Sequence, residues 1–369
     1  MSDITGSDDN GGFDITNPNL NILRRIDPGL LGRLNLDAFL GQQADDDDKE
    51  PPLDLSSLGN TELGSRNQRT EAVPDELRDI ELKLDLEPYE VDLVSVDELR
   101  RTPSTRLDPE IPNWVAPSLM PDKDRDLTKF GVNIRYGDRK LEPAVVIGSD
   151  QRRTYFDTRY PWGCICKIVT STGSSGTGVI VGPRHVLTAS HVVNWGNNNG
   201  VNGTVEVHRS GPYVRAISPI RRVHAFTRIT GPQIGWTELD EDYAVVVTRD
   251  RIGDRFGWFG ARTYHSGWDD EPYWYNLGYP GDIANASRPT WQRRKWLDEH
   301  AFDFGSGRAM DTNADINPGN SGGPMFGFWS NGPYVVSVVS AHDVDDQENY
   351  CSGGSDLPRL VSRARQLSP

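Results

Sequence analysis

The C-terminal part of the chain, from about Val145 onward, consists of short apolar runs separated by polar residues. The runs are rich in Val, Ile, Tyr and Trp, and Gly, Pro, Asn and Ser separate them; clear examples are residues 177–181, 243–247 and 334–339. Runs of this length and spacing are typical of antiparallel barrels and sandwiches, whereas a parallel sheet would need helices between its strands. The pattern predicts an all-β fold for this part.

One segment at the end of the chain has a helical pattern instead. Its apolar residues recur three and four positions apart, namely Leu357, Leu360, Val361, Ala364 and Leu367. Asp356 is positioned to cap a helix, and Pro358 falls in the first turn, where its missing N–H has no intrahelical partner to lose. We therefore expect a C-terminal helix.

The N-terminal part has a different composition. Residues 1–70 are rich in Asp, Asn, Gly, Leu and Pro without a sustained period. Such a segment buries too little apolar surface to offset the entropy lost on ordering, so we predict that it is acidic and disordered. Residues 80–86 and 91–94 alternate apolar and polar side chains at period two, which predicts half-buried strands in a small β-containing segment.

The formal net charge is −15 and is concentrated near the N-terminus: residues 1–140 hold 30 of the 54 acidic residues and 17 of the 39 basic ones. Nucleic acid is not an expected partner, because its recognition needs a basic surface. No stretch approaches the roughly 18 to 20 consecutive apolar residues that cross a bilayer, so no membrane span is expected. The N-terminus lacks the basic and apolar segments of a secretory signal, which leaves a secreted protein with its leader removed or a cytoplasmic protein.

Cysteine and histidine usage excludes two further kinds of site. Three cysteines cannot form a disulfide framework, and Cys164 and Cys166 flank one residue of a predicted strand, so their side chains point the same way. Either cysteine pairs with Cys351 or all three stay reduced. No Cys/His cluster has the spacing of metal ligands, so neither a catalytic metal nor another cofactor is expected.

The segment 319–324 reads Gly-Asn-Ser-Gly-Gly-Pro and places Ser321 between glycines. A nucleophilic serine needs a tight turn that presents its hydroxyl, with backbone N–H groups directed at the developing oxyanion. Glycine permits the dihedral angles of such a turn and leaves room for a substrate. Ser321 is therefore a candidate nucleophile.

Two further segments supply candidate partners for this serine. Residues 186–193 run from an apolar strand through Thr-Ala-Ser to His191, which predicts an imidazole at a strand end. A later apolar strand is preceded by three acidic residues, Asp240, Glu241 and Asp242. A carboxylate at such a place is costly to bury unless it is paired, and a histidine N–H is a suitable partner. We prefer Asp242 because it directly adjoins the strand.

His191, Asp242 and Ser321, in this order and 51 and 79 residues apart, resemble the triad of the chymotrypsin-like (trypsin-fold) serine peptidases. The resemblance implies that His191 is the general base, that Asp242 orients it and that Ser321 is the nucleophile. It also implies that the backbone N–H groups of Gly319 and Ser321 form the oxyanion hole. A protein or peptide would be the substrate.

The same resemblance implies the architecture. Two antiparallel six-stranded β-barrels would pack together, followed by the C-terminal helix and preceded by a partly disordered N-terminal region. The first barrel would span residues 145–250 and carry His191 and Asp242, and the second would span residues 251–369 and carry Ser321. The active cleft would lie between them.

Four segments are similar to the bacterial glutamyl endopeptidases: residues 146–152, 160–162, 278–282 and 309–312. This narrower resemblance implies a zymogen, in which residues 1–144 are removed to create a new amino terminus near Val145 or Val146. Residues 71–144 would then be a pro-region. Alternatively, they are an accessory segment that is never cleaved, or the N-terminal region recruits a regulatory partner and restrains an intracellular effector peptidase.

Substrate preference has two alternatives. In the glutamyl family a histidine after the nucleophile and a threonine before it help to neutralise a Glu side chain at P1, and His342 and Thr312 match these positions best. Residues 313–321 resemble the HtrA family instead, which favours small aliphatic P1 residues, and Ile316 would then occupy the floor of the pocket. We expect acidic specificity, with the aliphatic preference as the alternative. A non-catalytic binding module on the same scaffold is the rival from another functional class.

Overall fold

The computed structural model describes residues 49–54, 72–78, 86–102, 106–121, 149–196, 202–230, 234–235, 237–299, 306–343 and 348–369. All of them belong to one structural unit, residues 44–369. Most of the segment predicted to be disordered, residues 1–70, lies outside the described residues. So do residues 80–85 of the predicted strands and residues 146–148 of the resemblance to glutamyl endopeptidases.

Six antiparallel strands form a closed barrel in the first half of the fold. They run in the order β7-β6-β3-β4-β5-β8, and pairing between β7 and β8 closes the ring. Their side chains are almost all buried, as expected of short runs rich in β-branched residues. The strands are β3 (Ile165–Thr170), β4 (Ser175–Gly182), β5 (His185–Thr188), β6 (Gly203–Val207), β7 (Ala216–Ala225) and β8 (Ala244–Thr248). The predicted first barrel is confirmed.

The second sheet differs from the second closed barrel that we expected. Its strands follow an open path, β12-β13-β16-β15-β14-β10-β11-β2, and β9 pairs with β15 in parallel. Strands of only two and three residues end the path, so the described residues form a half-barrel whose ends carry few main-chain groups for closure. The strands are β2 (Arg153–Thr154), β9 (Gly260–Ala261), β10 (Trp274–Gly278), β11 (Thr290–Lys295), β12 (Leu297–Glu299), β13 (Gly307–Thr312), β14 (Pro324–Trp329), β15 (Gly332–Asp343) and β16 (Glu348–Gly354). β2 precedes the barrel in the chain yet pairs with β11 of this sheet.

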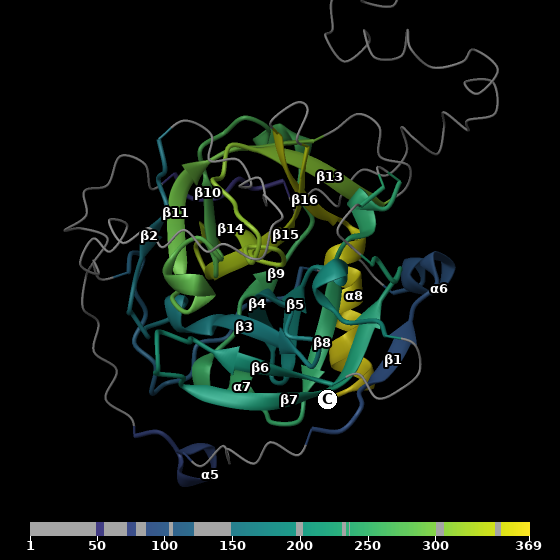
Figure 1. Cartoon of the computed structure of the whole chain (residues 1–369). Coiled ribbons are helices and arrows are strands. Elements are labelled where there is room, and N and C mark those ends of the chain that lie inside the picture. Colours follow the sequence, from purple (N-terminus) through teal and green to yellow (C-terminus); the bar gives the residue numbers. More distant parts are fainter. Residues whose placement is uncertain are drawn as a thin grey trace, which may run out of the picture. The chain divides into compact units, whose positions relative to one another are not determined.

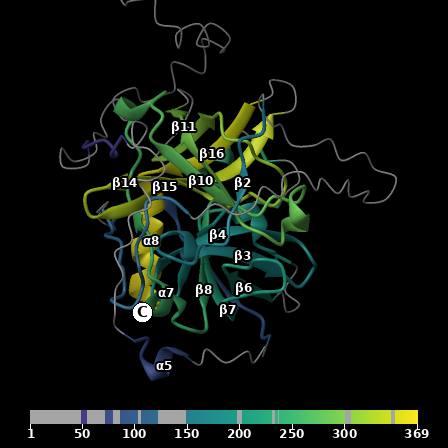
Figure 2. The ribbon, with the colours of Figure 1, turned by 90° about the vertical axis from the view of Figure 1, so that its left-hand side faces the viewer.

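The two sheets form adjacent layers, the barrel in teal and the second sheet in green to yellow (Figures 1 and 2). One hydrophobic core cluster includes residues from both of them. Trp162 lies within it, fully buried, and its ring contacts those of Tyr275, Trp291, Phe326 and Phe328 at centroid distances of 6.0 to 6.4 Å. Aromatic packing therefore joins the layers and fixes the second sheet against the segment that enters the barrel.

The predicted C-terminal helix is present as α8 (Asp356–Leu367) and packs against the barrel. Its predicted apolar residues are buried, except for Leu367 near the end. Asp356 is not the cap that we expected: it is the first helical residue, and its carboxylate accepts a hydrogen bond from Arg359. The remaining helical segments are short: α5 (Asp75–Arg78), α6 (Val96–Arg100), α7 (Ile252–Phe256), η2 (Trp162–Cys164), η3 (Ser190–Val192), η4 (Leu239–Glu241), η5 (Ser266–Trp268) and η6 (Ala284–Ala286).

The described residues 86–102 and 106–121, which we call the N-terminal belt, run along the barrel and the second sheet. Strand β1 (Glu90–Leu93) pairs in parallel with β7 of the barrel, which accounts for part of the predicted alternation. Leu99 of α6 is fully buried in the core cluster that both sheets share. Further along, Leu107 and Glu110 form β-bridges to Ala261 and Trp258. The belt is therefore packed into the same core as the barrel.

Acidic side chains of the belt meet basic side chains of the barrel and of α8. The four pairs are Glu87 with Arg221, Glu90 with Arg222, Asp92 with His224, and Glu98 with Arg363. Some of the negative charge of the N-terminal part is thus matched locally.

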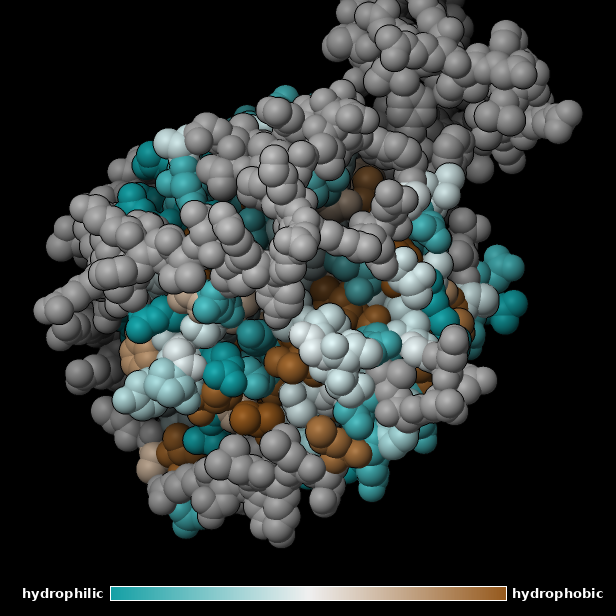
Figure 3. Space-filling view, in the orientation of Figure 1, coloured by the Kyte–Doolittle hydropathy of each residue, from teal (hydrophilic) through white to brown (hydrophobic). Residues whose placement is uncertain are grey.

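Figure 3 shows hydrophobic residues (brown) interspersed with hydrophilic ones (teal) on the face of Figure 1, so the surface there is mixed.

The three cysteines, Cys164, Cys166 and Cys351, are free and buried. Of the alternatives left open by the sequence, the reduced state is the one observed. Burial raises the pKa of each thiol well above its usual value, so none of them is readily ionised.

Within the described residues, no helix is long and apolar enough to cross a membrane.

Candidate active site

His191 and Asp242 are brought together by neighbouring strands of the barrel. β5 and β8 are antiparallel partners with Thr188 opposite Ala244, so the segment after β5 lies beside the segment before β8. His191 Nδ1 donates to Asp242 Oδ2 at 2.6 Å, and its backbone N–H donates to Oδ1 at 2.9 Å. Asp242 is fully buried, whereas the His191 side chain keeps 17% of its surface exposed. The Nδ1 bond leaves Nε2 as the imidazole nitrogen available to a further partner.

The second sheet also reaches this carboxylate. Ser340, on β15, donates its hydroxyl to Asp242 Oδ2. Asp242 therefore accepts three hydrogen bonds, which offsets the cost of burying its charge. Sequence reasoning missed Ser340, because nothing near it in the chain marks it as a partner of Asp242.

The other two acidic residues of this segment, Asp240 and Glu241, contact other parts of the protein. Asp240 lies on η4 beside Gly307 of the second sheet, and burial, with the nearby charge of Glu241, raises its pKa to about 6. Glu241 accepts a hydrogen bond from Thr227. Among the described residues, neither of them hydrogen-bonds His191. The preference for Asp242 over its two neighbours is thus consistent with the contacts.

Ser321 lies in the loop between β13 and β14, and we call residues 317–323 the nucleophile loop. Each carbonyl from residue 317 to residue 321 accepts a hydrogen bond. The donors, in that order, are Asn320 N (2.9 Å), Gly281 N (2.8 Å), Thr177 Oγ1 (2.6 Å), Gly323 N (2.7 Å) and Thr177 N (2.8 Å). The loop is fixed along its length by these bonds.

The backbone N–H groups of Gly319 and Ser321 differ from these carbonyls in their hydrogen bonding. Within the described part of the chain, the N–H of neither residue donates a hydrogen bond. In a trans peptide the C=O and N–H point in opposite directions, so anchoring Pro318 O and Asn320 O turns these two N–H groups away from the anchors. Two unpaired, fixed donors beside Ser321 are suited to an oxyanion.

The nucleophile loop lies against the barrel next to the histidine. Gly176, on β4, shows this: a Cβ atom there would lie 2.5 Å from Val192 Cγ2 and 3.1 Å from Ser321 O. Val192 directly follows His191 in the chain. The backbone of Ser321 and the segment that carries the imidazole therefore both lie close to Gly176. Gly322, at φ +80°, has no room for a side chain, since a Cβ would lie 2.2 Å from Thr188 Oγ1.

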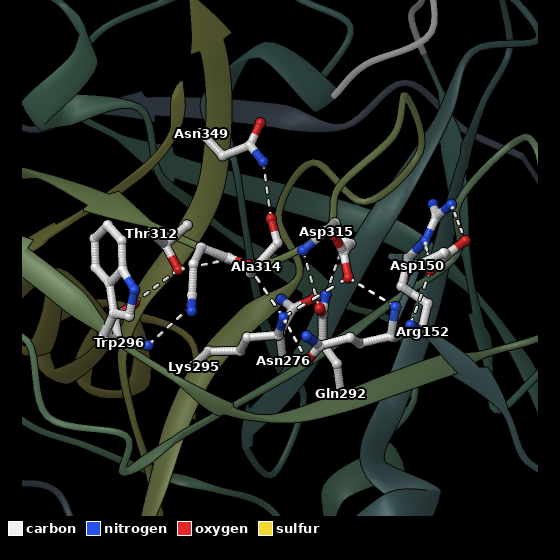
Figure 4. Close-up of polar contacts among 12 residues, drawn as sticks. Asp150, Arg152, Asn276, Gln292, Lys295, Trp296, Thr312, Ala314, Asp315 and Asn349 are labelled. Carbon is white, nitrogen blue, oxygen red and sulfur yellow. Dashed lines mark hydrogen bonds and ion pairs between the residues drawn. The ribbon is translucent and has the colours of Figure 1, made fainter. Parts of the chain in front are cut away.

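The three residues predicted to shape substrate preference lie on the second sheet and in its core. Thr312 on β13 and His342 on β15 both pair with Asn349, which lies on the strand between them, so the three side chains share a face of the sheet. Thr312 is buried, and its hydroxyl donates to Trp296 O and accepts from Ala314 N (Figure 4). His342 is half-buried. Ile316 is packed in the core cluster of this sheet.

A buried polar network, not foreseen from the sequence, supports the segment that precedes the nucleophile loop (Figure 4). Lys295 and Asp315, each with 1% of its side chain exposed, form an ion pair at 3.7 Å, and Gln151 N donates to Asp315 at 2.9 Å. Burial lowers the pKa of Lys295. Asn349 Nδ2 donates to Ala314 O and so ties the same segment to β16.

Arg152 extends this network to a second loop. Its guanidinium, 1% exposed, forms ion pairs with Asp150 at 2.9 Å and with Asp282 at 2.6 Å. Asp282 adjoins Gly281, whose N–H holds Pro318 O of the nucleophile loop. Residues 150–152 therefore connect the segment that precedes the nucleophile loop with the loop whose Gly281 holds Pro318 O.

Comparisons with known proteins agree with this architecture. Residues 176–328 match the family described as the trypsin-like peptidase domain. A glutamyl endopeptidase of Bacillus licheniformis is 30% identical over 189 residues, which are 49% of this chain and 54% of that protein. The chain thus spans about half the length of this curated relative. The resemblance expected from the sequence is confirmed.

Two solved structures are also similar. A Glu endopeptidase in complex with MPD has a TM-score of 0.49 and 23% identity, covering 60% of this chain and all of that one. The protease Anisep from Arthrobacter nicotinovorans has a TM-score of 0.41 and 20% identity, covering 54% of this chain and 92% of that one.

Proposed function

We propose that the protein is a serine endopeptidase with His191, Asp242 and Ser321 as its triad, because residues 176–328 match the family described as the trypsin-like peptidase domain. The observation that carries the proposal is the hydrogen bond from His191 Nδ1 to the buried carboxylate of Asp242 at 2.6 Å. It holds the imidazole in the tautomer that a general base needs, with Nε2 unprotonated.

In the proposed reaction, His191 Nε2 takes the proton of the Ser321 hydroxyl as the oxygen attacks the carbonyl of a peptide bond. The unpaired N–H groups of Gly319 and Ser321 receive the oxyanion. His191 then gives the proton to the leaving amine, and water hydrolyses the acyl-enzyme by the same steps. Asp242 orients the imidazole and stabilises its cation throughout.

We further propose an acidic P1 preference that depends on His342. The similarity to a protein named as a glutamyl endopeptidase supports this choice, as does the shared sheet face of His342 and Thr312. The Thr312 hydroxyl already donates to Trp296 O, so it supports the pocket wall and His342 is the side chain that meets the carboxylate. A peptide library separates the alternatives. Cleavage after Val or Ala, rather than after Glu, would favour the HtrA-like alternative, in which Ile316 forms the floor of the pocket.

The test of the peptidase activity is a comparison of Ser321→Ala with Ser287→Ala. Ser287 is a half-buried serine whose hydroxyl donates to Ala284 O and has no place in the proposed chemistry. We expect Ser321→Ala alone to lose casein hydrolysis and labelling by a fluorophosphonate, with unfolding unchanged. Wild-type turnover by Ser321→Ala would refute the proposal, and absence of any adduct on the wild-type chain would favour a binding module.

The fate of the N-terminal region is a separate question. Ion pairs and the β1–β7 pairing support retention of the belt as an accessory segment over loss of residues 1–144 as a whole. N-terminal sequencing and intact mass of active material decide between them. A single species beginning near Val145 would favour the zymogen with a discarded pro-region.

A further inference from the structure

We propose that the side-chain hydroxyl of Thr177 is a positioning group for the nucleophile loop, which holds the carbonyl of Gly319 and so sets the loop against the barrel that carries His191. The inference rests on the proposed function, and it adds a residue on the opposite sheet to the machinery. Thr177 lies on β4 and is fully buried.

Thr177 makes four hydrogen bonds, which connect three parts of the site. Its N–H donates to Ser321 O at 2.8 Å, and its Oγ1 donates to Gly319 O at 2.6 Å. The same Oγ1 accepts from Tyr279 N at 2.9 Å, and the Thr177 carbonyl accepts from Thr188 Oγ1 at 2.7 Å. Thr188 ends β5, from which the chain continues to His191.

Of these four hydrogen bonds, the one to Gly319 O can set the orientation of a flexible peptide group. Gly319 adopts φ +105°, a left-handed conformation in which only glycine is unstrained, and glycine rotates freely unless its peptide groups are held. Among the described residues, the Thr177 hydroxyl is the sole donor to Gly319 O. The other bond of this peptide group, from Asn320 N to Asn317 O, lies within the loop and moves with it.

The hydroxyl therefore links the flexible glycine of the loop to a rigid barrel strand. Both its proton and its lone pair are used, by Gly319 O and by Tyr279 N. Valine has nearly the shape of threonine but can make neither bond, which leaves two polar backbone groups unpaired. Displacement of a reacting group by about 1 Å can cost about 10²-fold in rate.

The experiment compares Thr177→Val with Thr177→Ser. We expect Thr177→Val to lower kcat by about 10- to 100-fold with KM changed less than about 3-fold, because the loop still binds substrate but presents the oxyanion donors poorly. Thr177→Ser keeps the hydroxyl and should stay within about 3-fold of the wild-type kcat. Equal kcat for Thr177→Val and the wild type, or equal loss in both variants, would overturn the inference.

Thr248→Val is the matched control. Thr248 is as buried as Thr177, and its hydroxyl donates to Arg184 O and Asp250 O at the far end of β8. A general loss of stability would lower the unfolding temperature of both valine variants, whereas only Thr177→Val should lower kcat. A kcat loss of the same size in Thr248→Val would count against a positioning role.

Crystal structures of the two Thr177 variants give a readout that needs no activity. We expect the Gly319 carbonyl to turn away from residue 177 in the valine variant and to keep its place in the serine variant. An unmoved carbonyl in both would contradict the inference. If Ser321→Ala kept full activity, the proposed function would fail, and the Gly319 orientation would still decide the role of Thr177.

Discussion

Ser340, on β15 of the second sheet, donates its hydroxyl to Asp242, which precedes β8 of the barrel. The bond crosses between the two sheets and ends on the carboxylate that holds His191. It therefore makes the orientation of the imidazole sensitive to how the sheets pack.

We expect Ser340→Ala to lower kcat/KM by about 10-fold, because a hydrogen bond to a charged group is worth about 1.5 to 3 kcal/mol and two others remain on Asp242. Steady-state kinetics across pH provides the measurement. Ser340→Thr, which keeps the hydroxyl, is the control, and an unchanged kcat/KM in Ser340→Ala would show that Asp242 does not depend on this bond.

His185 should make the fold sensitive to acid. It is fully buried, with Nε2 donating to Ala364 O at 3.1 Å and Nδ1 lacking a partner, and burial, with the charge of Arg365, lowers its pKa to about 4. The unfolded chain therefore binds more protons than the folded one between about pH 4 and 6.5, so stability falls as the pH falls through this window. The full effect is about 3 kcal/mol.

Urea unfolding of the wild type and of His185→Gln, at pH values from 7.5 to 4, tests this. The carboxyls of Asp240 and Asp269, whose pKa values burial raises to about 6, act in the opposite direction but contribute equally to both proteins. The stability difference between the two proteins should shrink as the pH falls. A constant difference would mean that His185 does not titrate differently on unfolding.

The buried pair of Lys295 and Asp315 should behave as a coupled unit. Lys295→Met leaves the Asp315 carboxylate buried with the Gln151 N–H as a remaining donor, and we expect a loss of about 3 to 5 kcal/mol in unfolding free energy. Adding Asp315→Asn removes the uncompensated charge and should restore most of the loss. Additive losses in the double variant would show that the pair is not coupled.

A surface ion pair provides the control for the Lys295 and Asp315 variants. Arg251 and Asp254 form an ion pair with 44% and 29% of their side chains exposed. Removing either charge should change the unfolding free energy by only about 0 to 1 kcal/mol.

Leu99 tests whether the belt contributes to stability. Because its side chain is fully buried in the core cluster, Leu99→Ala should lower the unfolding free energy by about 2 to 5 kcal/mol. Leu93→Ala, at a belt position with 44% of its surface exposed, should change it by less than about 0.5 kcal/mol. Equal effects of the two substitutions would indicate that the belt is not packed as described.

The candidate site residues that could be predicted carry local signals in the chain. Ser321 lies between glycines, His191 follows a strand and a small-residue turn, and Asp242 directly precedes an apolar strand. In each case the residues that give this signal are adjacent in sequence. Part of the first barrel was predictable for the same reason, since the apolar runs at residues 177–181 and 243–247 fall on β4 and β8, whereas β7 carries polar and charged residues within the strand.

The partners that hold these residues carry no such signal. Thr177 contacts Gly319 142 positions away, and Ser340 contacts Asp242 98 positions away. Lys295 reaches Gln151 across 144 positions. Which polar residue faces which depends on the packing of the two sheets, and a threonine or serine inside a strand looks the same in sequence whether or not it has such a partner.

The open second sheet could not be foreseen either. Strand β2 has two residues, too few for an alternation pattern, and it pairs with β11, which follows the whole barrel in the chain. The predicted cap of α8 was wrong by one position: Ser355 precedes the first helical residue, Asp356, and serine and aspartate are both common helix caps, so the residue type alone does not separate them.

The position of β1 has a consequence for any shortened form of the protein. The first part of β7 pairs with β6, and the last part, residues 222–225, pairs with β1 on one side and β8 on the other. A chain that begins near Val145 would leave this stretch of main chain without its neighbour, and unpaired strand edges recruit strands from other molecules. Light scattering should therefore reveal self-association of the truncated protein at concentrations where the intact chain stays dispersed.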